Sequence, residues 1–147
     1  MRALVLGLAS ACVLVACPGP PATGPVQVAW DRDVCSRCNM AISDPRFAAQ
    51  IRTASDQRAH VFDDLGCALL WLDAEGAALG GAEEIWVRDL AGADWLDARA
   101  ARFVAAEHTP MNYGFGAVAA PADAALALEQ VHAQVREVEG GRRAHHR

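Results

Sequence analysis

The sequence contains no lysine, and all 13 basic residues of the 147-residue chain are arginines. We attribute this absence to the composition of the genome. Residues 17–139 hold 9 arginines and 18 acidic residues, a net charge of −9 (9 − 18). Proteins that bind nucleic acid need a basic face for its phosphate backbone, so this balance excludes nucleic acid as a partner. The final residues, 140–147, reverse the sign with three arginines and two histidines, and we expect a frayed, solvated terminus there.

Patterns of catalytic residues are missing as well. The order of residues shows no Ser/His/Asp set, no phosphate-binding loop and no pair of catalytic carboxylates. The length allows one ordinary domain or two very small ones, and a content of 53% apolar residues is enough for a buried core. The sequence therefore favours a binding protein over an enzyme.

The apolar run at the N-terminus is too short to cross a bilayer. It covers Ala3–Val15, follows the positive charge of Arg2, and is typical of a secretion signal. The run ends in Leu14-Val15-Ala16-Cys17, which is similar to the bacterial lipobox that signal peptidase cuts before the cysteine. We expect residues 1–16 to be a lipoprotein signal peptide and Cys17 to carry the lipid. An ordinary cleaved signal with a chance cysteine is the alternative.

Either kind of signal places the protein outside the cytoplasm, in an oxidising compartment. A lipid on Cys17 predicts a cell-membrane lipoprotein that faces the periplasm, since two or more acyl chains give a stable anchor. Residues 17–25 are rich in proline and glycine and predict a flexible tether. Because Cys12 leaves with the signal, the thiols of the folded part are Cys35, Cys38 and Cys67.

The stretch Cys35-Ser36-Arg37-Cys38-Asn39-Met40 is the clearest motif in the chain. One local turn can aim two cysteines at C-x-x-C spacing at a single point, as in metal sites and redox disulfides. The thioether of Met40 adds a soft donor, and thiolate with thioether selects Cu(I). A structural disulfide, redox catalysis and a zinc site are the alternatives. Redox catalysis is the least favoured of these, because Ile42-Ser43-Asp44-Pro45 predicts a turn where thioredoxin-like enzymes begin a long helix.

The remaining elements form two similar sets of strands followed by a helix. We predict strands at Val26–Trp30, 47–53, 59–62, 84–90, 103–106 and 115–119, with a further strand beginning at Trp95. We predict helices at 65–75 and from Pro121 to about Val135.

Five further positions are candidates for metal binding or for structure. Asp63 and Asp64 precede the first predicted helix and are expected to cap it. Cys67 is expected to be a small core residue on that helix. His60 is expected to be a surface histidine with metal ligation as the alternative. Met111 lies in the polar loop 108–114, where the simplest expectation is a side chain that folds back onto the core.

The motifs together, in their order, resemble the NosL family of nitrous oxide reductase accessory lipoproteins. They are the lipobox, C-x-x-C-x-Met, Phe62-Asp63-Asp64-Leu65-Gly66-Cys67, Trp86-Val87-Arg88-Asp89, Asp94-Trp95-Leu96-Asp97-Ala98 and Thr109-Pro110-Met111-Asn112-Tyr113-Gly114. The family often has glycine where this chain has Asn39. Asparagine tolerates a left-handed backbone nearly as well as glycine does, so the turn is expected to be kept.

The resemblance implies an α+β fold made of two small homologous ββαβ halves packed in one compact unit. The halves are expected at 26–92, with the C-x-x-C-x-M copper motif, and at 93–139, before the Arg/His-rich tail 140–147. The implied function is a membrane-anchored metallochaperone that supplies Cu(I) for assembly of the copper centres of nitrous oxide reductase in denitrification. The implied partners are that reductase and its maturation proteins, and a homodimer is left open.

The resemblance also implies a ligand set. The implied metal ligands are Cys38, Met40, Met111, Cys35, His60 and His108. Two alternative functions stay open at this point. One is a lipoprotein scaffold with a structural Cys35–Cys38 disulfide, and the other is a periplasmic thiol-disulfide oxidoreductase.

Overall fold

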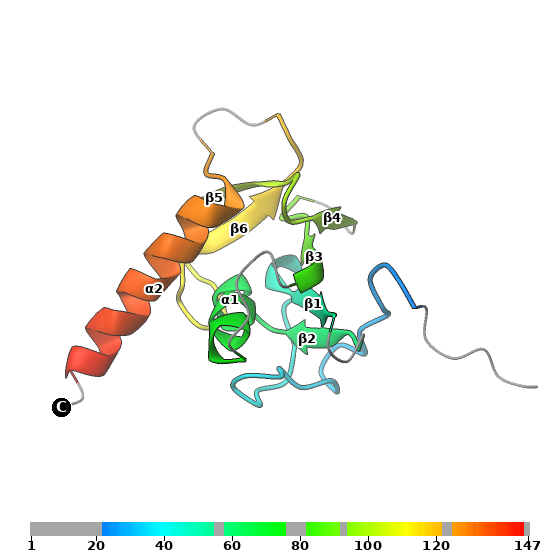
Figure 1. The fold of residues 1–147 in the computed structure, drawn as a ribbon, viewed down its shortest axis with the longest axis horizontal. Helices are drawn as coiled ribbons and strands as arrows, with labels where there is room; N and C mark the ends of the chain where they lie inside the picture. Colours follow the sequence, from blue (N-terminus) through cyan, green and yellow to red (C-terminus); the bar gives the residue numbers. More distant parts are fainter. Residues whose placement is uncertain (1–21, 55–57, 76–81, 92–93, 122–124, 146–147) are drawn as a thin grey trace, which may run out of the picture.

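The computed structural model describes residues 22–54, 58–75, 82–91, 94–121 and 125–145. Within these ranges the chain forms two antiparallel sheets, two α-helices and one short 3₁₀ helix, η1 (Pro45–Phe47), which pack together (Figure 1). The α+β class and the compact packing expected from the sequence are confirmed. No helix among these residues is long and apolar enough to cross a membrane.

The first sheet has the strand order β2-β1-β3-β4. Its strands are β1 (Ala49–Thr53), β2 (His60–Phe62), β3 (Ala82–Arg88) and β4 (Trp95–Asp97). Helix α1 (Leu65–Ala74) lies between β2 and β3 in the chain, so the first half has the expected order ββαβ. The strand β4, which the sequence assigned to the second half, pairs with β3 in this sheet.

The second half contains β5 (Arg102–Ala105), β6 (Phe115–Val118) and the long helix α2 (Leu128–His145). The two strands form a separate hairpin, and α2 runs beside it and beside α1 (Figure 1). A parallel bridge between Asp89 and Ala117 joins the hairpin to the end of β3. Both halves contribute to the main core, which includes Ile51, Phe103 and Val131, and a smaller cluster contains Val28, Ile42 and Ala48.

The central strand β1 is buried along its whole length because it is covered on both faces. The side chain of Gln50 accepts the Val26 N–H at 2.8 Å and donates to the Val26 carbonyl at the same distance. The strand predicted at Val26–Trp30 is therefore wrong, since this segment pairs with a side chain. The Gly24 N–H donates to the Glu84 carboxylate at 2.8 Å, so the end of the predicted tether is fixed to the sheet.

The second helix differs from its prediction at both ends. Leu126, predicted to be helical, exchanges two backbone hydrogen bonds with Phe103, which holds the chain extended until α2 begins at Leu128. Gly140–His145, predicted to fray, are helical. The Arg142 guanidinium explains this order, because it donates to the carbonyls of Met111 and Asn112 at 2.9 and 3.0 Å.

Candidate metal centre

A small hairpin closed by a bridge between Val34 and Ala41 presents the two cysteines of the C-x-x-C motif. The Cys35 N–H donates to the Met40 carbonyl at 2.8 Å, and the Asn39 N–H donates to the Cys35 carbonyl at 3.0 Å. Asn39 has φ of 59°, so the left-handed turn expected at this asparagine is confirmed. The turn buries the Cys35 side chain and leaves Cys38 partly buried.

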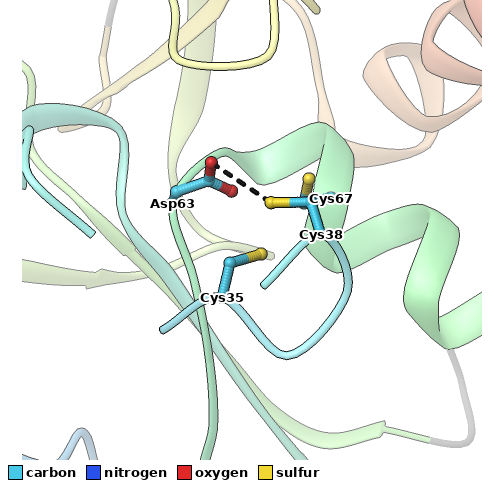
Figure 2. A group of neighbouring side chains, drawn as sticks. All are labelled: Cys35, Cys38, Asp63 and Cys67. Atoms are coloured by element: carbon cyan, nitrogen blue, oxygen red, sulfur yellow. Dashed lines mark hydrogen bonds between the residues drawn. The ribbon is translucent and has the colours of Figure 1, made fainter. Parts of the chain in front are cut away.

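A second segment, from the end of β2 into α1, supplies two more side chains. The Ser36 N–H donates to the Val61 carbonyl at 2.8 Å, which holds the hairpin against β2. Asp63 follows β2, and Cys67 lies in the first turn of α1. Four side chains meet here: Cys35, Cys38, Asp63 and Cys67 (Figure 2). Each offers one ligand atom, and these four atoms lie within 4.8 Å of one another. We refer to these four residues as the thiol cluster.

Cys35 is the most acidic thiol of the cluster. A hydrogen bond from Cys67 is the main reason that the pKa of Cys35 falls to about 6, although burial opposes it. Backbone N–H groups of Cys38, Asp63 and Arg37 lower this pKa further. Because the pKa lies below 7, Cys35 is a thiolate at neutral pH.

The other two thiols hold their protons more strongly. Burial is the main cause that raises the pKa of Cys38 to about 11. The hydrogen bond to Cys35 is the main cause that raises the pKa of Cys67, and burial adds to it. The metal-free cluster therefore holds one thiolate and two thiols at neutral pH, and a metal that takes all three sulfurs must displace two protons.

Asp63 lies in the cluster with one oxygen unused. The Cys38 thiol donates to its Oδ2 across 3.5 Å, a weak interaction, and its buried Oδ1 has no hydrogen-bond partner. A buried carboxylate with an orphaned oxygen destabilises a fold unless a ligand compensates it. The unused oxygen and the soft sulfur donors therefore fit a bound metal ion.

The neighbouring Asp64 has a structural role instead. Its Oδ1 accepts the Gly66 N–H at 2.8 Å and caps α1, as the sequence predicted. Its Oδ2 accepts the Thr109 hydroxyl at 2.6 Å and the Met111 N–H at 3.0 Å. Asp64 thus fixes the start of α1 and the loop that carries Met111. The two adjacent aspartates, both predicted to cap the helix, have different environments.

Two more of the expected ligands line a cleft that shares Asp63 with the cluster, and a third packs against the core. Met40 is 50% exposed and lines a cleft of about 350 Å³ together with His108 and Asp63. Met111 is partly buried against the main core. The cleft reaches the cluster at Asp63, which belongs to both.

His60 packs its ring on Trp71, with 4.4 Å between the ring centroids, and is not one of the four cluster residues. The structure thus joins Cys35 and Cys38, places Met40 and His108 at a shared cleft, and gives Met111 and His60 packing contacts. The ligand roles of all six stay predictions.

The sequence analysis favoured structural roles over metal binding for Cys67 and Asp63, and the structure places both in the thiol cluster. Their approach to the C-x-x-C hairpin depends on how β2 and α1 pack, which residue spacing does not encode. One signal was available: Cys67 is the third cysteine of the part expected to fold in an oxidising compartment, and the three cysteines among the described residues are free thiols.

The fold and the cluster define a small α+β protein with a sulfur-rich candidate metal site. A comparison with curated sequences finds no significant match. The NosL family model matches residues 25–127, and the chain belongs to the NosL family. A crystal structure of the copper chaperone NosL from Shewanella denitrificans is similar, with a TM-score of 0.55 at 18% identity. The match covers 80% of this chain and 89% of the other, and at this identity it establishes the fold.

The different roles of the two aspartates can be tested in the reduced, metal-free protein. Asp64→Asn should lower the free energy of unfolding by about 1–3 kcal/mol, because its amide NH₂ would replace one of two accepting oxygens. Asp63→Asn should leave that free energy equal or higher, because the buried Oδ1 of Asp63 has no hydrogen-bond partner to lose. Denaturant titration compares the two variants. An equal loss of stability in both would show that Asp63 is structural.

Proposed function

We propose that the protein is a copper chaperone that binds one Cu(I) ion through the sulfurs of Cys35, Cys38 and Cys67 and releases it to a partner protein. It is a carrier and not an enzyme. The observation that carries this proposal is the convergence of three free thiols and a carboxylate within 4.8 Å. Family membership and the fold shared with a copper chaperone support it.

The chemistry of the donors favours the monovalent ion. Thiolate is a soft ligand, and Cu(I) is the soft oxidation state of copper. A set of three thiolates and one carboxylate also suits the tetrahedral coordination of Zn²⁺. Zinc is therefore the metal against which the copper proposal has to be tested.

The cleft beside the cluster suits the release of the ion. Met40 and His108 line it, and Asp63 connects it to the sulfurs. A thioether is a neutral and weaker donor than a thiolate, so a copper ion can exchange through it. In this proposal Met40 contacts the ion as it passes to the partner, and His108 offers an imidazole at the same opening.

An anaerobic titration of the reduced protein with Cu(I), against a competing chelator, tests the site. Cys67→Ala should weaken Cu(I) binding at least about tenfold, or about 1.4 kcal/mol, because it removes one of three sulfur ligands. The matched control is Ser36→Ala, an exposed residue of the same hairpin. Met111→Leu, which keeps a similar volume, weakens binding only if this thioether is a further ligand. Unchanged affinity in Cys67→Ala would rule out the three-sulfur site.

We further propose that a lipid on Cys17 anchors the protein to a membrane facing the periplasm, and that the recipient of copper is nitrous oxide reductase with its maturation proteins. The lipobox motivates the first part and the family the second. Cells without the protein should make a reductase deficient in copper, which metal analysis of the purified enzyme measures. A fully copper-loaded reductase in the deletion strain would contradict the assignment of the partner.

The Cys17→Ser variant tests the lipid anchor. It should be found outside the membrane fraction or with its signal uncut.

A further inference from the structure

Arg37, between the two cysteines of the hairpin, makes contacts that a metal-binding turn alone does not require. Its Nη1 lies 3.9 Å from the Cys67 sulfur and 3.2 Å from the Tyr113 hydroxyl oxygen. Its Nη2 donates to Glu139 on α2 at 3.0 Å. The side chain is only 22% exposed, so the guanidinium is held beside the cluster.

We propose that Arg37 determines the metal specificity of the thiol cluster by favouring Cu(I) over divalent ions, Zn²⁺ above all. The inference deepens the proposed copper function and rests on it. Donor type alone does not give this preference, since the cluster also suits zinc.

The reason is the charge of the loaded site. With the same ligands in the same protonation state, a site that holds Cu(I) is one elementary charge more negative than a site that holds Zn²⁺. A positive charge fixed nearby stabilises the more negative of the two states more strongly. A guanidinium keeps its charge at every relevant pH, so it supplies this preference constantly.

Neighbouring groups fix the guanidinium in place and add to the local field. Glu139 accepts from Arg37 and also from the Tyr113 hydroxyl, at 3.0 Å each. The negative charge of Glu139 offsets part of the positive charge of Arg37. Arg143 also pairs with Glu139, at 3.3 Å, and so reduces this offset. Arg142 lies over the Tyr113 ring, 4.6 Å from its centroid. Because Nη1 faces the sulfur and Nη2 faces Glu139, the positive group lies between the carboxylate and the cluster.

The experiment measures Cu(I) and Zn²⁺ affinities of the same reduced protein, each by chelator competition, and takes their ratio. Arg37→Gln should lower the Cu(I)-to-Zn²⁺ ratio about tenfold, and Arg37→Lys should retain most of it. Glu139→Gln should raise the ratio, since it removes a negative charge beside the guanidinium. The control is Arg136→Gln, which removes an arginine of α2 that pairs with Asp73 on α1.

The Cu(I)-to-Zn²⁺ ratio is expected to fall in Arg37→Gln and to rise in Glu139→Gln. These opposite changes distinguish an effect of charge from an effect on the structure. A purely structural loss would lower both affinities together and leave their ratio unchanged, and that result would overturn the inference. If Arg37→Gln does not fold, Glu139→Gln and Arg37→Lys still decide the question. If the wild-type protein takes no Cu(I) at this cluster, the proposed function fails as well, and the two failures are thereby distinguished.

Discussion

The site depends on the docking of one hairpin against the segment Val61–Cys67. That segment supplies the carbonyl that binds Ser36, the carboxylate of Asp63 and the thiol of Cys67. The docking buries Cys35 completely and places its sulfur among N–H groups that favour a thiolate. Cys67 lies in the first turn of α1, and its thiol donates the hydrogen bond that contributes most to lowering the pKa of Cys35. The cluster can therefore hold one thiolate inside the protein before a metal arrives.

The second half of the chain completes the site from outside. Gly66 lies so close to the Tyr113 ring that any side chain at this position would clash with it. The end of α2 contacts both halves of the site, because Glu139 binds Arg37 and Arg142 binds the carbonyl of Met111. The body of the protein is acidic, whereas the end of α2 is basic. The guanidinium of Arg37 places a fixed positive charge next to the Cys67 sulfur.

Features set by neighbouring residues could be predicted from the sequence, and features set by distant contacts could not. The turn at Asn39 and the cap at Asp64 follow from local backbone chemistry, and both are confirmed. The prediction that Cys67 is a core residue is confirmed, but nothing in the sequence shows that the C-x-x-C hairpin packs against the first turn of its helix. The end of α2 was predicted to fray. It is held by the hydrogen bond from Arg142 to the Met111 carbonyl, which joins residues about thirty positions apart and is not visible in the sequence.

X-ray absorption at the copper edge of the Cu(I)-loaded protein identifies the atoms bound to the metal. We expect three sulfur neighbours in the wild-type protein and one fewer in Cys67→Ala, with copper in the monovalent state. A first shell made of nitrogen and oxygen alone, or a sulfur count that Cys67→Ala leaves unchanged, would contradict this expectation.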